Sequence, residues 1–347
     1  MQQLDLKAWS AMPSLGGAHS HATSVYRQSP VVTDEQHRLD AALSLLFPST
    51  VHVHSSLSLS GHIHSLRLIV LSNGARVLLK GSPSSSTALL RRERSFLENE
   101  AQFLALLGQS GNPCIPQLYN YDPSGRPWGS PYLIRQYMNG RSLSEMENEI
   151  SPVQRDGIDR HLGFLLSTIG QNAAPGFGTL QQVARGAGTS SWRDAFCALF
   201  EGILRDAEDT FVHLPYSEIR DGLSRLAPAL EDVTLPRLVV VDFGRPSHIL
   251  LDEESKQLSG IVDFSSALWG DVLMAEIFET PSQAILQGAG IPLLRTREEQ
   301  IRLVLYACYR LVSQITVQYY RTRDEASEFD SRRRLTTTIA EMMRFEL

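Results

Sequence analysis

The feature that most restricts the fold is the separation of two hydrophobic patterns along the chain. Residues 51–81 contain short strand-like runs, and Ser72-Asn73-Gly74 between two of them is a strong hairpin signal. After about residue 145 the apolar residues recur at helical spacing, as in 161–171 and 191–211. Within this helical part, strand patterns return only at 236–264. We therefore expect an α+β protein with a small β-rich part and a larger helical part.

The length of 347 residues exceeds what one compact core usually needs, so two lobes are expected. Residues 1–33, rich in Ser, Gly, His and Pro, are predicted to be an irregular arm. Residues 34–138 are predicted to form the N-lobe, in which one helix follows the hairpin. Residues 139–347 are predicted to form the helical C-lobe, with the β segment 236–264 inside it.

Composition limits the classes of partner. The formal charge is -6, which argues against a nucleic-acid-binding surface. The longest apolar runs fall far short of the roughly 20 residues of a membrane span. Cys114, Cys197 and Cys308 are scattered and form no C-x-x-C pair, so we expect reduced thiols in a cytoplasmic protein. No nucleic acid and no membrane partner is expected.

Several common sites are absent from the sequence, including G-x-x-x-x-G-K-[ST], G-x-S-x-G and H-E-x-x-H. His52, His54, His62 and His64 alternate along the β region, which puts each pair on one face of a strand. Because no cysteine or carboxylate partner lies nearby in the sequence, we predict solvated histidines rather than a metal site.

Three residues carry candidate phosphate chemistry. Lys80 ends the strand-like run RVLLK, where a rigid strand can direct an ammonium to nucleotide phosphates. Glu100, in the helix that follows, can hold that ammonium, although Glu93 and Glu98 are rivals. Asp263 follows the apolar residues of LSGIVDF (258–264), a position at the end of a strand that suits a carboxylate delivered to Mg²⁺. Each has an ordinary structural alternative, but their order along the chain favours one site.

The segment LSGIVDFSSALWGDVLMAEIF resembles the aminoglycoside phosphotransferase-like family of small-molecule kinases. Asp263 matches the family's metal-binding aspartate, and the A-x-x-G-D that follows it is also present. PYLIRQYMNGRSL resembles the hinge strand of that family, whose backbone near Gln136, Tyr137 and Met138 would bind adenine.

This resemblance covers roughly residues 55–290 and extends to the strand of Lys80 and the helix of Glu100. It implies a two-lobed protein-kinase-like fold, ATP and Mg²⁺ as cofactors, and a small-molecule substrate. The N-lobe match is looser, because SLSGHIHSLRL offers one glycine where the family has a glycine-rich phosphate loop.

Asp242-Phe243-Gly244 has the letters of the metal-binding tripeptide of protein kinases. The preceding LAPALEDVTLPRL lacks the H-R-D-x-x-x-x-N loop that should come before it, and Asp263 already fills the metal position. The resemblance instead places Asp242 in the catalytic loop, which in the family reads H-G-D, four residues and Asn. Here Val240 and Val241 replace the His and Gly.

The catalytic loop is one residue too long, so two registers remain open. Counting back from ILLD puts His248 at the Asn position and Phe243, which cannot accept a proton, at the catalytic Asp. Counting forward keeps Asp242 as the catalytic Asp and makes one residue an insertion, or puts Ser247 at the Asn position. Gly244 permits a backbone bulge that absorbs the extra residue. His248 is a poor ligand for Mg²⁺.

Two functions remain open. The first is an ATP- and Mg²⁺-dependent phosphotransferase, in which Asp242 orients or deprotonates a small-molecule hydroxyl. The alternative is a kinase-shaped protein that has lost phosphoryl transfer and uses its cleft for another reaction on a metabolite, or for binding only. In that case Asp242 or His248 acts as acid or base and no cofactor is needed. Trp192 and Phe196 hint at an apolar substrate but are also consistent with helix core.

Overall fold

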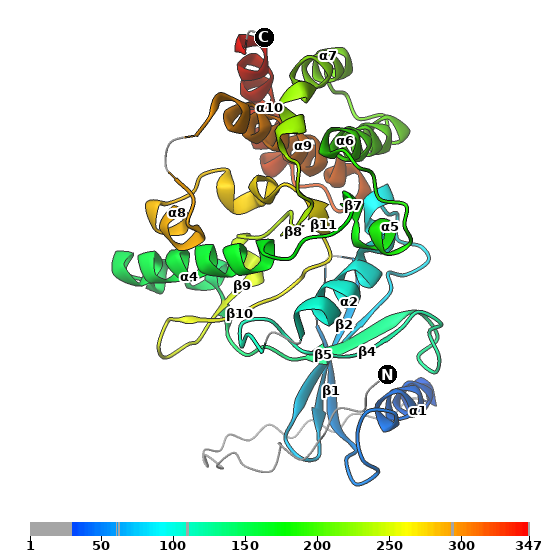
Figure 1. Cartoon of the computed structure of the whole chain (residues 1–347). Helices are drawn as coiled ribbons and strands as arrows, with labels where there is room; N and C mark the ends of the chain where they lie inside the picture. The colour runs from blue at the N-terminus through cyan, green and yellow to red at the C-terminus, as the bar shows by residue number, and fades with distance from the viewer. Residues whose placement is uncertain (1–29, 60, 62, 109–110, 293–294, 346–347) are drawn as a thin grey trace.

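The computed structural model describes residues 30–345 except 60, 62, 109–110 and 293–294. A β-rich N-lobe and a larger helical C-lobe lie one above the other, with α2 between them (Figure 1). The predicted two-lobed α+β fold is confirmed. The predicted arm at 1–33 falls almost entirely outside the described residues, and α1 begins at Pro30.

The N-lobe is built on one five-stranded antiparallel sheet in the order β1-β2-β3-β5-β4. Its strands are β1 (Val53–Leu59), β2 (Ser65–Leu71), β3 (Arg76–Gly81), β4 (Leu118–Asp122) and β5 (Tyr132–Gln136). The predicted turn between β2 and β3 is present: Gly74 has φ +83° and the Leu71 amide donates to the Ala75 carbonyl at 2.8 Å. Since β3 and β5 lie inside the sheet, Lys80 stands on a strand that is hydrogen-bonded on both sides.

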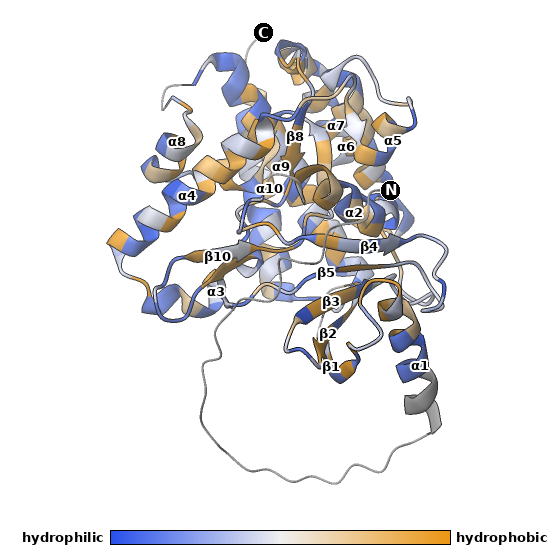
Figure 2. Cartoon of the chain, turned by 60° about the horizontal axis from the view of Figure 1, so that its bottom comes forward, coloured by the Kyte–Doolittle hydropathy of each residue, from blue (hydrophilic) through white to orange (hydrophobic). Residues whose placement is uncertain are grey.

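Two helices cover the sheet of the N-lobe. The apolar side of α1 (Pro30–Ser44) packs against the sheet through Leu39, Ala42 and Leu43. The second helix, α2 (Phe96–Leu107), contacts β5 with one part of its surface and the C-lobe core with another. Figure 2 shows the corresponding alternation of hydrophobic and hydrophilic residues around α1 and α4. The helix that carries Glu100 is therefore fixed to both lobes.

The C-lobe consists mainly of helices around one hydrophobic core. They are α3 (Leu143–Met146), α4 (Pro152–Gly170), α5 (Leu180–Ala184), α6 (Trp192–Asp209), α7 (Tyr216–Leu226), α8 (Gln283–Ala289), α9 (Arg297–Tyr320) and α10 (Glu325–Arg344). Thr296 caps α9, where its hydroxyl accepts from the Glu299 amide at 3.1 Å. None of the described helices is long and apolar enough to cross a membrane.

Trp192 and Phe196 of α6 belong to the C-lobe core, with exposed fractions of 2% and 0%. The Trp192 indole donates to the Tyr306 hydroxyl at 2.7 Å, and Tyr306 in turn donates to the Asp271 carboxylate at 2.7 Å. Arg302 donates to the same carboxylate oxygen at 2.9 Å. Asp271, the aspartate of the A-x-x-G-D pattern, is thus the centre of a buried polar cluster that fixes β11 (Ala267–Gly270) to α9.

Two three-stranded sheets inside the C-lobe carry the segments that resemble the catalytic machinery. One has the order β10-β9-β6 and the other β7-β11-β8. Their strands are β6 (Arg141–Ser142), β7 (Gly178–Thr179), β8 (Arg237–Val240), β9 (Ile249–Leu251), β10 (Leu258–Ile261) and β11 (Ala267–Gly270). The loop after β8 and the turn between β10 and β11 therefore emerge side by side, on the side of the C-lobe that faces the N-lobe.

Candidate active site

The centre of the candidate site is the side chain of Lys80. Its Nζ donates to Glu100 Oε2 at 2.5 Å and to Asp263 Oδ1 at 3.4 Å. The Lys80 and Glu100 side chains are 5% and 0% exposed, and that of Asp263 is 35% exposed. The structure thus brings together the three residues predicted from the sequence. Glu93, a rival for the role of Glu100, instead accepts hydrogen bonds from the Leu90 amide and Arg321.

A second cation shares Glu100 with Lys80 and was missed in the sequence. Arg135 lies on β5 opposite Leu78, while Lys80 lies opposite Leu133, so alternation puts Lys80 and Arg135 on the same face of the sheet. Arg135 Nε is 3.4 Å from Glu100 Oε1 and its side chain is 6% exposed. The signal in the sequence was a single charged residue inside an otherwise apolar strand.

Asp263 adopts a backbone conformation that few residues tolerate. Its φ of +67° lies in the left-handed region, which costs on the order of 1 kcal/mol for a residue with a side chain. The Ser265 hydroxyl and amide both donate to Asp263 Oδ1, at 2.5 and 3.2 Å. Partial burial opposes ionisation, but Lys80, His248 and these hydrogen bonds outweigh it, so the pKa of Asp263 is lowered. The carboxylate is therefore ionised at neutral pH.

Phe264 fixes the position of Asp263 from the neighbouring place in the chain. Its ring stacks on Phe103 of α2 with centroids 4.4 Å apart and planes 11° from parallel. Both rings are fully buried. The helix that holds Glu100 is thereby packed directly against the residue that follows Asp263. This packing fixes the carboxylates of Glu100 and Asp263 relative to each other.

The carboxylate of Asp242 faces a separate group of polar side chains. The Ser266 hydroxyl donates to Asp242 Oδ1, and the Asp242 amide donates back to that hydroxyl at 3.3 Å. Asp242 Oδ2 lies 3.9 Å from His248 Nδ1 and 3.7 Å from Arg245 Nη1. The structure therefore brings the two predicted catalytic residues, Asp242 and His248, next to each other.

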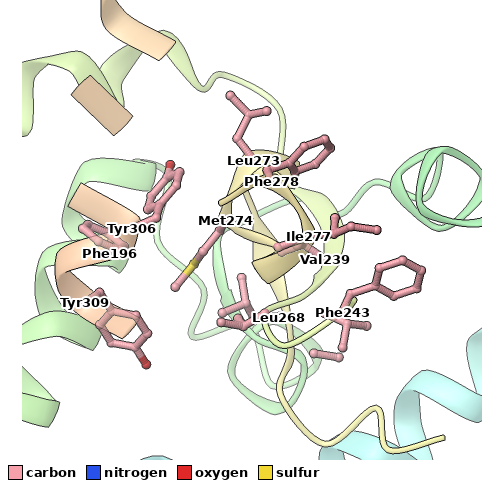
Figure 3. Packing of buried hydrophobic residues seen from close by; sticks show 14 of the residues in the cluster. Phe196, Val239, Phe243, Leu268, Leu273, Met274, Ile277, Phe278, Tyr306 and Tyr309 are labelled. Carbon is pink, nitrogen blue, oxygen red and sulfur yellow. The ribbon is translucent and has the colours of Figure 1, made fainter. Parts of the chain in front are cut away.

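The loop between Asp242 and His248 takes a left-handed backbone conformation at Gly244. This glycine has φ +103°, and a Cβ atom there would lie 2.7 Å from Ile277 Cβ. Phe243 packs its ring into the hydrophobic core beside Ile277 (Figure 3), and its carbonyl accepts from the Ile277 amide at 2.9 Å. Since Phe243 points into the core, the loop presents the carboxylate of Asp242 to the site.

The connecting strand between the lobes carries the predicted adenine contacts. The Gln136 amide donates to the Gln117 carbonyl at 2.8 Å, and the Tyr137 amide to the Arg76 carbonyl at 3.4 Å. The Gln136 carbonyl accepts from Arg135 at 3.1 Å. Within the described residues the backbone of Met138 makes no such bond, which leaves it the freest of the three for a ligand.

The residues present fit one magnesium ion at Asp263. Mg²⁺ is usually held by one or two carboxylates, with substrate phosphates and water completing the shell. Asp263 Oδ1 is engaged by Ser265 and Lys80, and Oδ2 takes no partner within the described part of the chain. His248 offers nitrogen where an oxygen would suit a second Mg²⁺, so a second ion is not supported.

The predicted solvation of the histidines is wrong for one of them. His52 and His54 are exposed, and His62 lies outside the described residues. His64, however, is only 7% exposed. It directly precedes β2 and turns inward beside β3, because the pairing of Ser65 with Gly81 continues the alternation of the sheet.

A cavity of about 540 Å³ lies away from the Lys80 cluster, between α2, α5 and α6. Its wall includes Trp192, Leu268 and Arg92, but none of the residues predicted from the sequence to act in catalysis, nucleotide binding or metal binding. Arg92 donates to the Tyr309 hydroxyl at 3.0 Å. This cavity is separate from the residues of the candidate active site.

Solved structures with the same fold include several phosphotransferases. A protein described as an aminoglycoside phosphotransferase of Ralstonia eutropha is 13% identical, with TM-score 0.63, and the match covers 88% of this chain and 96% of that one. A protein described as a fructosamine-3-kinase of Thermobifida fusca is 17% identical, with TM-score 0.63 and coverage of 88% and 99%. The streptomycin–ATP complex of APH(2")-IIa is 16% identical, with TM-score 0.57 and coverage of 92% and 100%.

No curated protein matches the sequence. The sequence profile of the phosphotransferase enzyme family, in contrast, matches residues 66–274, which is more than half of the chain. The matched region includes Lys80, Glu100 and Arg135 in the N-lobe and both Asp242 and Asp263 in the C-lobe. The chain belongs to the phosphotransferase enzyme family, with the kinase-like fold of the small-molecule phosphotransferases.

Proposed function

We propose that this protein is an ATP- and Mg²⁺-dependent phosphotransferase that acts on a hydroxyl group of a small molecule. The observation that carries the proposal is the position of the Lys80 ammonium, 2.5 Å from Glu100 and 3.4 Å from Asp263. The contact between Lys80 of the N-lobe and Asp263 of the C-lobe joins the lobes where the phosphates of a nucleoside triphosphate would lie. A cation and an ionised carboxylate held in fixed positions are what phosphoryl transfer requires.

In this proposal each residue of the Lys80 cluster has one role. Lys80 binds the phosphates, and Glu100 holds Lys80 in place. Asp263 would hold Mg²⁺, which neutralises charge on the phosphates when it is bound. The backbone of Met138, with Gln136 and Tyr137 beside it, would bind adenine. The left-handed backbone of Asp263 supports this role, since such conformations cluster at functional sites.

Asp242 is the residue proposed to act on the acceptor. Its carboxylate would orient the hydroxyl and take its proton as the oxygen attacks the terminal phosphorus of ATP, while the bond from that phosphorus to the bridging oxygen breaks and ADP leaves. Ser266, Arg245 and His248 hold the carboxylate in place. Arg245 is itself fixed by Glu276, 3.0 Å away. The side chain of Asp242 is 17% exposed, so an acceptor can reach it.

The relatives support a small-molecule acceptor without identifying it. Structures of the same fold hold streptomycin with ATP in one case and hygromycin B with AMP-PNP in another. A cytoplasmic location is part of the proposal, because all three cysteines are free.

A thermal shift experiment tests the nucleotide site first. Mg²⁺·ATP should raise the melting temperature of the wild type, and Asp263→Ala should lose most of that shift, because ligand binding stabilises the folded state. An exposed aspartate serves as the control, and Asp252→Ala should keep the shift. Absence of any shift at millimolar Mg²⁺·ATP would reject the proposal.

A second function is favoured by one observation, the crowding of Asp242. Three side chains already contact its carboxylate, and two of them, Arg245 and His248, are groups that the family's H-G-D loop does not predict. In this alternative the cleft binds a metabolite, or acts on it with Asp242 or His248 as acid or base, without transferring phosphate. Binding of Mg²⁺·ATP with no turnover on any acceptor, and no effect of Asp242→Asn, would favour it.

A further inference from the structure

His64 occupies the turn between β1 and β2, near the cluster of Lys80, Glu100 and Asp263 (the Lys80 cluster). Leu66 pairs with Lys80 across β2 and β3, so the two side chains share one face of the sheet. Alternation puts His64, two residues earlier, on that same face. The imidazole is 7% exposed, and its Nδ1 lies 3.1 Å from the carbonyl oxygen of Gly81, the residue after Lys80.

The contact with Gly81 fixes the protonation of the ring. A carbonyl oxygen only accepts hydrogen bonds, so Nδ1 of His64 must carry the proton and donate. In the neutral ring Nε2 is then an acceptor. This atom is shielded from solvent and has no hydrogen-bond partner within the described residues. A buried polar atom without a partner is costly, and a ligand, an ion or a water molecule that bonds to it removes that cost.

The charges around His64 suit a polyphosphate. Burial and the nearby Lys80 ammonium lower the pKa of His64 to about 4, against the opposing pull of Asp263 and the Gly81 hydrogen bond. Beyond Lys80, Glu100 forms ion pairs with both Lys80 and Arg135. The ring is therefore neutral in the free protein at pH 7. A bound polyphosphate would add several negative charges beside the ring, and these charges would raise the pKa of His64.

We propose that His64 is a phosphate-binding residue of the nucleotide site: when ATP binds, Nε2 takes up a proton from solvent and donates a hydrogen bond to a phosphate oxygen. This inference rests on the function proposed above and adds a residue to the same site. Since Nε2 is shielded in the free protein, binding includes a small displacement of the ring or of the turn.

The composition of the turn explains why a side chain, rather than backbone amides, would bind the phosphate. Phosphate loops usually bind through backbone amides exposed by several glycines. The β1–β2 turn has one glycine, Gly61, whose Cβ position lies 2.5 Å from the His64 carbonyl oxygen, so this glycine serves the close packing of the turn. A protonated imidazole replaces missing amide donors with one charged donor.

The test compares ATP with adenosine as ligands of the wild type, His64→Leu and His64→Gln. ATP should bind about 10- to 100-fold more weakly to His64→Leu, as expected for loss of a hydrogen bond to a charged group. His64→Gln, which keeps an N–H donor without the charge, should fall between the two. Adenosine should bind all three equally. His54→Gln, an exposed histidine on β1, is the matched control, and thermal melts confirm that each variant is folded.

Proton uptake provides the second readout. Calorimetric titrations of Mg²⁺·ATP in two buffers of different ionisation enthalpy should show greater proton uptake by the wild type than by His64→Gln. Equal ATP affinity and equal proton uptake in the folded variants would overturn the role of His64 and leave the proposed function standing. Equal loss of ATP and adenosine affinity would also overturn it. Failure of the wild type to bind ATP would overturn both proposals.

Discussion

The nucleotide side and the acceptor side of the candidate site differ in how firmly their charges are held. On the nucleotide side, the side chains of Lys80, Glu100 and Arg135 are no more than 6% exposed, and that of Asp263 is 35% exposed. On the acceptor side, Asp242 and His248 are 17% and 11% exposed, and the groups that hold the loop, Glu276 and Arg245, are 23% and 41% exposed. Charges in the first group are screened little by water, whereas those in the second are screened more.

The two halves also differ in how they compare with the family pattern that the sequence suggested. The nucleotide half brings together Lys80, Glu100 and Asp263, the residues that this pattern predicts, and Arg135 adds a second cation. In the acceptor half, Arg245 contacts Asp242 and is itself held by Glu276. We infer that the nucleotide half is built more rigidly than the acceptor half.

The largest expected effect is on turnover at the acceptor side. Asp242→Asn should lower turnover about 100- to 10,000-fold, the usual contribution of a positioned general base. Affinity for Mg²⁺·ATP should stay within about twofold, because Asp242 belongs to the acceptor side. Steady-state kinetics together with calorimetry separate the two quantities. Asp252→Asn is the control on an exposed turn, and unchanged turnover in Asp242→Asn would show that the acceptor side is not catalytic.

The next largest effect concerns stability on the nucleotide side. Glu100→Leu should lower the free energy of unfolding by about 3–5 kcal/mol, because it leaves two buried cations without their shared carboxylate. Glu98→Leu, on the same helix and partly exposed, should lower it by about 1 kcal/mol or less. Urea denaturation of both variants measures the contrast. Similar values for the two would contradict the claim that the nucleotide side is the rigid half.

A pH effect on stability should follow from His64. Its pKa is about 4 in the folded protein and 6.5 for the unperturbed group, so the unfolded chain binds more protons between these values. The free energy of unfolding should therefore rise with pH across this window, by up to about 3 kcal/mol from this residue. Asp263 titrates below the window. Denaturation at pH 4.5, 5.5 and 7 should show a smaller slope in His64→Leu, and equal slopes would count against a neutral buried His64.

The smallest effect is expected at Arg245. Arg245→Met removes partly exposed contacts to Glu276 and Asp242, so the loss of stability should stay within about 1 kcal/mol. Turnover should fall several-fold, because Asp242 loses one of the groups that orient it. A change in affinity for Mg²⁺·ATP would contradict the separation of the two halves.

Much of this architecture was predictable because it depends on short, local sequence patterns. The turn at Asn73-Gly74 and the pattern of a strand followed closely by Asp263 each involve a few consecutive residues, and each is confirmed as a structural feature. Lys80 and Glu100 were predictable as a pair because one strand and the next helix position them.

The remainder depends on contacts between distant segments. Arg135 reaches Glu100 because α2 packs against β5, and Ser266 reaches Asp242 because β8 and β11 pair side by side. His64 was predicted to be solvated because no cysteine or carboxylate partner lies nearby in the sequence, whereas its burial is set by β3. The histidine spacing identified the face of the strand but not what that face contacts.

The central claim is that Lys80 and Asp263 form a nucleotide phosphate site. Titration of the wild type and Lys80→Met with Mg²⁺·ATP, monitored by calorimetry, tests it most directly. We predict saturable binding to the wild type and at least about tenfold weaker binding to Lys80→Met, with adenosine affinity unchanged, since the ammonium contacts only the phosphates. No binding to the wild type at millimolar Mg²⁺·ATP, or equal binding to the folded Lys80→Met protein, would contradict the claim.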